Sequence, residues 1–288
     1  VSATGKSTLR AIGSMLVAVA MWSTMMMLVK SLSTDYTSFQ ILFIRTLVSL
    51  ALLAPMIWRS GFFRLKTKRF PLHLTRGIFA YIGMLGLFIG IGEIPIAEVV
   101  SLSFTQPIFI FLLAAVLLGE KFSAAQVAAI IGGFIGVVII LRPGFSEIGL
   151  GAAVVLGGAL AYACSNVCIK KLMATDSITG TTIWVNLIIC PLAGIPAAIY
   201  WVPPTLPDLA LLAGVGITGT AGIWFISRAY ALADMSAVVP FDFLRLPILA
   251  AAGWIWFSEI PDIWTFAGAA VIFASTYSLA RDEAHKQR

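Results

Sequence analysis

The segment Ala97–Pro107 (AEVVSLSFTQP) has a counterpart in Ala237–Pro247 (AVVPFDFLRLP), in the second half of the chain. Other matches follow in the same order and at nearly the same spacing. They pair Trp22 with Tyr162, Lys30 with Lys170, and the apolar run ending in Leu118-Gly119-Glu120 with the one ending in Phe257-Ser258-Glu259. The chain is therefore predicted to contain two copies of one unit, at residues 1–140 and 141–288.

The composition places both copies in a membrane. Hydrophobic residues make up 60% of the chain, charged residues only 11%, and the mean hydropathy is +0.99. Soluble domains carry about a quarter charged residues, whereas a bilayer-spanning helix needs about 20 mostly apolar residues. Ten segments meet this requirement, at residues 9–32, 37–57, 72–92, 97–119, 123–141, 149–172, 179–201, 206–230, 237–258 and 261–280. The predicted fold class is an all-α polytopic membrane protein.

Each copy holds five of these segments, and an odd number of crossings reverses the direction of the chain. The second copy therefore enters the membrane from the side opposite the first, so the two copies form inverted five-helix repeats. Inverted repeats are a building plan of secondary transporters, whose solute site lies near the bilayer midplane between the repeats. The pattern predicts a transporter of small solutes.

The lysines and arginines of the loops predict the orientation. Nearly all of them fall on one side of the membrane, and the other side carries only Lys30 and Arg142. Cytoplasmic loops are enriched in these residues, so both termini are expected in the cytoplasm. The net charge of +6 then reflects topology and contact with anionic lipid, and no nucleic-acid partner is expected.

The sequence offers little support for an intramembrane enzyme. It has two histidines and three cysteines, and only Asp242 among the aspartates lies deep in a predicted helix. A serine–histidine pair, a zinc site and a twin-aspartate site therefore lack their partners. A channel is also disfavoured, because no ring of polar residues lines any one helix. We expect no catalytic residue, no metal and no cofactor.

The most specific local signal is a pair of charges inside the ninth segment. Asp242 and Arg245 are one helical turn apart and should face the same way, although charge at a helix centre costs about 2.5–3.5 kcal/mol. The equivalent residues of the first copy, Leu102 and Thr105, are uncharged. Two interpretations stay open: an ion pair that stabilises the ninth segment, or an ion pair that also presents a guanidinium to an anionic solute.

Other polar and aromatic residues inside predicted helices are candidates for the solute site. Each has an ordinary alternative: the aromatic rings pack, Arg45 extends to the interface or pairs with a neighbour, Glu98 caps a helix, and Arg228 anchors a helix end. The candidate solute-binding residues are Trp22, Tyr81, Thr105, Gln106, Tyr162, Trp224, Asp242 and Arg245, and the possible proton or charge sites are Glu98, Arg45 and Arg228.

Glycines recur at short spacings in three helices. Small residues let helix backbones approach closely in a membrane, where no hydrophobic effect drives their association. Packing is the favoured interpretation for Gly132, Gly133 and Gly136, whereas the group Gly214–Gly222 is left open between packing and a moving interface.

The repeat pattern as a whole resembles the EamA-type branch of the drug/metabolite transporter superfamily. The resemblance covers roughly residues 9–280 and rests on the motifs at 118–120 and 257–259, on Ala20-Met21-Trp22-Ser23, and on Pro107 echoed by Pro247. It implies a central cavity walled by helices one, three, four, six, eight and nine, with helices five and ten at the periphery. Ser258 and Arg245 depart from the family pattern.

The resemblance is greatest to bacterial inner-membrane exporters of amino acids, including aromatic ones. It implies a secondary transporter that exports small amphipathic metabolites, most naturally amino acids, by alternating access around a midplane cavity. An exporter of toxic organic cations, a nucleotide-sugar-like permease and, with less support, an intramembrane enzyme are the alternatives. Expected partners are the small-molecule substrate and the lipid bilayer, and the chain is either a monomer or a homodimer.

Overall fold

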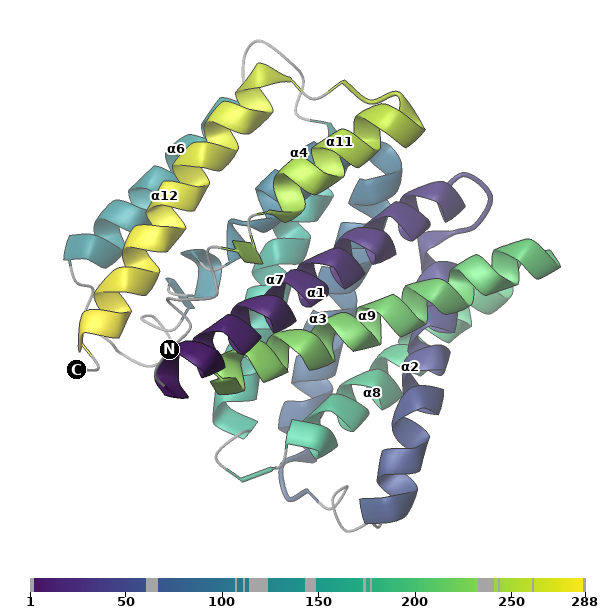
Figure 1. Ribbon diagram of the computed structural model, residues 1–288. Coiled ribbons are helices and arrows are strands. Elements are labelled where there is room, and N and C mark those ends of the chain that lie inside the picture. Colours follow the sequence, from purple (N-terminus) through teal and green to yellow (C-terminus); the bar gives the residue numbers. More distant parts are fainter. Residues whose placement is uncertain are drawn as a thin grey trace.

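Long apolar segments fold into helices because, in a bilayer, each backbone N–H and C=O must find its partner within the segment. A computed structural model describes residues 3–60, 67–106, 108–110, 112–113, 124–142, 149–172, 175–176, 178–232, 241–242, 244–260 and 262–286. Within these residues lie ten helices of eight or more residues and no strand (Figure 1). The helices are α1 (Ala3–Leu32), α2 (Ser38–Ser60), α3 (Phe70–Glu93), α4 (Ile96–Ser103), α6 (Ala124–Leu141), α7 (Leu150–Leu172), α8 (Ile178–Ile199), α9 (Leu206–Leu232), α11 (Arg245–Phe257) and α12 (Ile263–Lys286).

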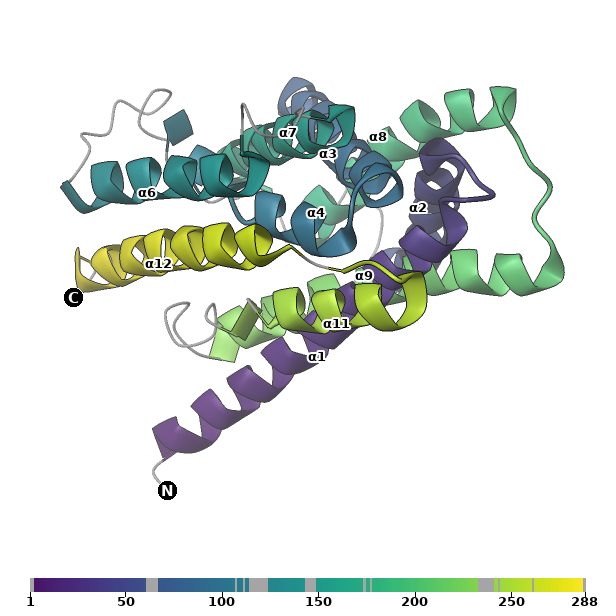
Figure 2. The same cartoon turned by 90° about the horizontal axis from the view of Figure 1, so that it is seen from above.

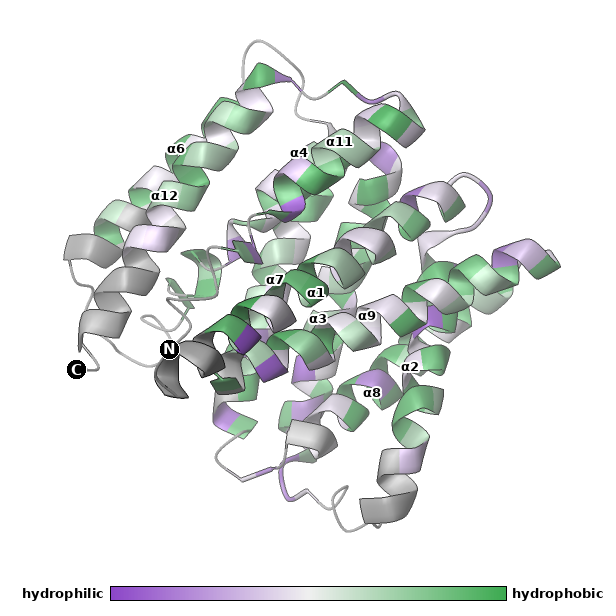
Figure 3. Ribbon diagram, viewed as in Figure 1, coloured by the Kyte–Doolittle hydropathy of each residue, from purple (hydrophilic) through white to green (hydrophobic). Residues whose placement is uncertain are grey.

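These ten helices fall on the ten predicted segments. Six of them, α1, α2, α3, α7, α8 and α9, contain stretches long and apolar enough to cross a bilayer, and the other four contribute shorter apolar stretches. Hydrophobic residues run along the helices in the described part of the chain (Figure 3). The predicted all-α polytopic membrane fold is confirmed.

Helices of the two halves pack against each other in a repeated pattern. α1 lies along α9, and its equivalent α7 lies along α3. The contact of α2 with α9 likewise matches that of α8 with α3, and the contact of α1 with α11 matches that of α7 with α4. The remaining main pairs, α2 with α8, α4 with α11 and α6 with α12, join equivalent helices. Two inverted repeats related by a pseudo-two-fold axis produce this set of contacts.

The two views show the consequence for the shape. Seen from above, α6, α7, α3 and α8 form one layer, and α12, α11, α1 and α9 form the other (Figure 2). The first turns of α1 and the last turns of α12 lie on the same side of the bundle (Figure 1), as an even number of crossings requires. The division at 140/141 stays a prediction, because residues 143–148 lie outside the described residues.

The fourth segment, predicted over 97–119, is discontinuous. α4 ends at Ser103, and a turn at Phe104 and Thr105 interrupts it. In the sequence, Pro107 follows at once, and a proline can supply no N–H to a carbonyl of the preceding turn. Pro107 and the motif at 118–120 lie outside the described residues.

The ninth segment breaks at the equivalent place. Within the segment predicted over 237–258, α11 begins only at Arg245, after a turn at Leu244. Pro247 then stands in the first turn of α11, where the missing N–H would have had no helical partner. Arg245 therefore opens a helix instead of lying in the middle of one. Paired broken helices mark the solute site in many transporters.

Glycines set the closest helix contacts. A Cβ on Gly86 of α3 would lie 2.8 Å from the Val154 carbonyl oxygen and 3.1 Å from the Gly158 Cα of α7. A Cβ on Gly136 of α6 would lie 2.8 Å from the carbonyl oxygen of Gly268 in α12. Backbone therefore meets backbone in both pairs, which confirms the packing interpretation for Gly136.

Candidate solute-binding site

Arg245 projects from the break in the ninth segment toward aromatic rings of two other elements. Its guanidinium carbon lies 5.0 Å from the centre of the Trp22 ring of α1 and 5.3 Å from the Phe104 ring at the break after α4. Both distances fall within the range of a cation–π contact. The two breaks and the middle of α1 thus meet at one guanidinium group.

Asp242 completes this group of side chains. Its Oδ2 accepts a hydrogen bond of 2.5 Å from the Arg245 Nη2, and the predicted ion pair is therefore present. The two side chains are 20% and 16% exposed, so the pair is largely withdrawn from the surface. The second carboxylate oxygen, Oδ1, is buried and finds no hydrogen-bond partner among the residues that the structure describes. A buried acceptor without a donor is costly, and it is available to a donor on a solute.

The Trp22 ring packs directly against a glycine on the facing helix. A Cβ on Gly222 of α9 would lie 2.5 Å from both Cδ1 and Nε1 of the Trp22 ring. Tyr162, the equivalent of Trp22 in the second repeat, packs in the same way, 2.6 Å from the place of a Cβ on Gly83 of α3. The two rings occupy equivalent positions in the two repeats, as the sequence predicted.

Arg45 of α2 is the most buried cation of the described residues. It is 4% exposed, and its Nε has no hydrogen-bond partner. Its guanidinium lies beside Gly219 of α9, where a Cβ would stand 3.2 Å from Nε and from Nη2. Tyr162 is close enough to interact with it electrostatically. The predicted alternative of a side chain that extends to the interface is wrong, because the group is enclosed.

Three further candidates lie near the breaks or in the core. Tyr81 of α3 is half-buried against the central apolar cluster. Thr105 is 2% exposed, donates to the Leu102 carbonyl at 2.6 Å, and borders a hollow of about 50 Å³ together with Phe109. Gln106 is half-buried at the first residue after the turn. Whether these residues contact the solute stays a prediction.

The structure separates the last candidates from this group. Trp224 is 54% exposed and lies 5.4 Å from the Arg228 guanidinium, which is also exposed. Glu98 is half-buried in the first turn of α4, with Arg142 and Asp262 as its charged neighbours. These residues stay predictions: Trp224 contacts Arg228, and Glu98 lies near Arg142 and Asp262.

An ion pair closes the end of the bundle at which α1 ends. Lys30 Nζ lies 2.7 Å from Glu259 Oε1 and donates to the Ile94 carbonyl at 3.1 Å, while Glu259 Oε2 accepts from the Ile96 N–H at 2.8 Å. The network therefore joins the end of α1, the α3–α4 connection and the segment between α11 and α12. We call it the Lys30–Glu259 lock.

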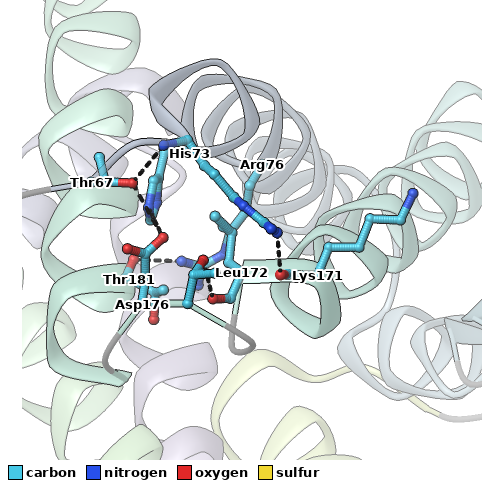
Figure 4. A network of polar contacts seen from close by, with 9 residues as sticks. Thr67, His73, Arg76, Lys171, Leu172, Asp176 and Thr181 are labelled. Atoms are coloured by element: carbon cyan, nitrogen blue, oxygen red, sulfur yellow. Dashed lines mark hydrogen bonds and ion pairs between the residues drawn. The ribbon is translucent and has the colours of Figure 1, made fainter.

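A second polar network lies at the opposite end, where α3 begins (Figure 4). Asp176 accepts from Thr67 and contacts His73 Nε2, both at 3.2 Å. Arg76, 8% exposed, donates to the Thr181 carbonyl. Arg76 is one of the lysines and arginines that the charge distribution assigns to the cytoplasmic side. Its position three residues after His73, and therefore on the same helix face, is a signal that could have identified it as a buried residue.

The described residues contain a second, larger hollow. It measures about 330 Å³, is lined by apolar side chains including Pro247, Trp254 and Phe266, and lies between α11 and α12. No group of three or more His, Cys, Asp or Glu side chains gathers anywhere in the described ranges. The charged chemistry of the described bundle interior therefore rests on arginines and on single carboxylates.

Two inverted repeats, with both broken helices and a buried ion pair at the place where they meet, define a multi-pass secondary transporter. The sequence profile of the EamA-like transporter family matches the chain twice, over residues 9–142 and 149–281. The chain therefore belongs to the EamA-like transporter family.

Relatives and a solved structure extend over almost the whole chain. The riboflavin transporter of Rhizobium johnstonii is 32% identical over 96% of this chain and 89% of its own. The S-adenosylmethionine uptake transporter of Rickettsia bellii is 31% identical over 88% of this chain and 87% of its own. The pseudopaline exporter of Pseudomonas aeruginosa is 28% identical over 90% and 92%. One crystal structure, 19% identical, superposes with a TM-score of 0.65 over 94% of this chain and 98% of that chain.

Proposed function

We propose that the chain exports small amphipathic metabolites, most naturally amino acids including aromatic ones. The observation that carries the proposal is the Arg245 guanidinium, which is paired with Asp242 and lies over Trp22 and Phe104. Two ring faces and an ion pair in one place provide an apolar wall and polar groups for a solute with a flat ring and a charged end.

The ammonium group and the ring of an amino acid have counterparts at this site. The ammonium group can donate to the Asp242 Oδ1, which is buried without a hydrogen-bond partner among the described residues. The ring can lie against Trp22 and Phe104, with Tyr81 and Tyr162 as further walls and Thr105 and Gln106 beside the break. No covalent step is involved, so the proposal includes no enzymatic activity.

Alternating access requires that one end closes while the other opens. The Lys30–Glu259 lock supports closure at its own end, because it joins α1 to connections of both repeats. We propose that this end is periplasmic, that both termini are cytoplasmic, and that the membrane is the bacterial inner membrane. A reporter fused to the C-terminus, active only in the cytoplasm, checks this orientation, and periplasmic activity would contradict it.

A second candidate solute comes from the relatives. Riboflavin and S-adenosylmethionine both carry a flat conjugated ring, and S-adenosylmethionine also ends in an amino acid. Trp22 and Phe104 suit any such ring, so a ring-bearing vitamin or cofactor is the alternative to a free aromatic amino acid. An exporter of organic cations has less support, because the Asp242–Arg245 pair beside the rings carries no net charge, which suits a zwitterion and gives a cation no net attraction.

Transport by the purified chain tests the proposal. Proteoliposomes without ATP are loaded with unlabelled phenylalanine, S-adenosylmethionine or riboflavin, and uptake of the same labelled compound is followed. We expect saturable, trans-stimulated uptake of phenylalanine, because the solute gradient is the only energy source. Uptake of riboflavin alone would favour the second candidate, and exchange of lipophilic cations with none of the three would overturn both. Chemical crosslinking of the protein in membranes at low protein density separates a monomer from a homodimer, because only a homodimer gives a crosslinked pair.

A further inference from the structure

Arg45 is a buried cation with no carboxylate partner among the described residues. Lys30 pairs with Glu259, Arg245 with Asp242, and Arg142 with Asp262. Arg76 donates to a backbone carbonyl. Within the part of the chain that the structure describes, the buried Nε of Arg45 has no hydrogen-bond partner and no carboxylate pairs with the guanidinium, although the residue is only 4% exposed.

The surroundings of Arg45 are shaped to accommodate this group. Gly219 of α9 provides the room, since a Cβ there would lie 2.9 Å from the Met25 Sδ and 3.2 Å from two guanidinium nitrogens. One turn further along the same face of α9, Gly222 accommodates the Trp22 ring. Arg45 and Arg245 therefore approach the neighbourhood of Trp22 from different helices. These contacts connect Arg45, through Gly219 and Gly222 of α9, to the Trp22 ring.

The repeat symmetry shows that the packing does not require a charge at this position. Gly216 of α9 packs against Val48 of α2, and its equivalent Gly77 of α3 packs against Ile188 of α8, with matching closest approaches of 2.5 Å. In this register the equivalent of Arg45 is Val185, a half-buried residue packed against the central apolar cluster. An apolar side chain thus suffices where only helix packing is required.

An unpaired guanidinium in such a place is costly. Arginine stays protonated in proteins, and a charge withdrawn from water must be paired with an anion if its burial is not to destabilise the fold. An ionisable residue inside a membrane protein is therefore a candidate functional site. The missing partner is best supplied by a molecule that enters and leaves.

We propose that Arg45 binds the carboxylate of the transported solute, whose ring lies at Trp22, Phe104 and Arg245. The inference rests on the proposed function for the position of the ring, and it adds that the solute is a carboxylate-bearing compound. Arg245 is already neutralised by Asp242 and serves the ring and the ammonium group, while Arg45 supplies the free positive charge.

Thermal unfolding of the purified protein in detergent, followed by tryptophan fluorescence, tests Arg45 directly. The probes are phenylacetate and phenylacetamide, which have the same ring and differ in charge, at equal ionic strength. In the wild type, phenylacetate should raise the unfolding midpoint and phenylacetamide should not. In Arg45→Met the difference between the probes should vanish, while the midpoint without probe should rise by roughly 2–4 °C, since an unpaired buried charge is removed.

Arg45→Lys is the matched control, because it keeps the charge and loses the planar fork; it should retain part of the phenylacetate effect. If Arg45→Met does not fold, the comparison of Arg45→Lys with the wild type still measures the effect. An equal response of the wild type to both probes, or a full phenylacetate effect in Arg45→Met, would overturn the proposal.

Transport separates this inference from the proposed function. Phenylalanine uptake at an equal rate by the wild type and by Arg45→Met would sink the role of Arg45 and leave the amino acid transporter standing. Absence of phenylalanine uptake by the wild type, together with an Arg45-dependent phenylacetate effect, would sink the amino acid transporter and leave the carboxylate site standing.

Discussion

The interface of α3 with α7 and that of α1 with α9 are the same contact built twice, yet they hold different chemistry. Tyr162 rests on Gly83 in the first, and Trp22 rests on Gly222 in the second. Around the second interface lie Arg45 and Arg245, and the equivalent positions of the other repeat carry Val185 and Thr105. Contacts that recur in both repeats form the scaffold, and residues that break the symmetry are the ones to examine for function.

Removal of Arg245 should have the largest effect on the second interface. Arg245→Met leaves the Asp242 carboxylate buried without its partner, and such a loss costs about 3–5 kcal/mol. Unfolding should occur at a much lower temperature, and transport should be lost. The double change with Asp242→Ala should recover stability without activity. Recovery of both stability and transport would show that Arg245 has only a structural role, and the difference between the repeats at this position would then have no bearing on function.

Changes to the two equivalent rings, Trp22 and Tyr162, should have the next largest effect on transport. Trp22→Ala removes a ring under the Arg245 guanidinium, a contact that contributes about 0.5–2 kcal/mol, so the half-saturating concentration of phenylalanine should rise roughly two- to thirtyfold. Alanine uptake should change less. Tyr162→Phe keeps the ring of the other repeat and should be nearly neutral. Equal losses for both solutes in Trp22→Ala would count against a side-chain wall.

A pair of glycine changes measures the shared scaffold. Gly77→Ala and Gly216→Ala place a methyl group 2.5 Å from Ile188 and Val48, respectively. Overpacking of this kind costs about 1–3 kcal/mol, and the two variants should lose similar amounts in denaturant or thermal unfolding. A large loss of stability in only one variant would show that the α3–α8 and α2–α9 interfaces do not contribute equally to stability. That result would weaken the comparison of the two repeats.

The ion pairs at the Lys30 end should give the smallest effects. Arg142 and Asp262 are 38% and 40% exposed, so Arg142→Met should change stability by only about 0–1 kcal/mol. Lys30 and Glu259 are each 14% exposed, and Lys30→Met should have a larger effect and increase the alkylation of a cysteine placed at Ser33. Equal alkylation in Lys30→Met and Arg142→Met would show that the Lys30–Glu259 lock does not control access to the site.

The sequence predicted the repeats, the helices and the Asp242–Arg245 ion pair, because apolar length and residue spacing are local properties. It did not predict that α4 ends at Ser103 and that α11 begins at Arg245, since a proline limits where a helix continues and tertiary contacts decide where it stops. It also left Arg45 ambiguous. Burial beside Gly219 depends on the approach of α2 to α9, which one segment alone cannot show.

The most direct test of the central claim is an experimental structure with a transported solute bound. The account predicts density for the solute ring against Trp22 and Phe104, with its ammonium near Asp242 and its carboxylate near Arg45. Density elsewhere, for example in the apolar hollow between α11 and α12 lined by Pro247 and Trp254, with Arg45 and Arg245 unchanged, would contradict it.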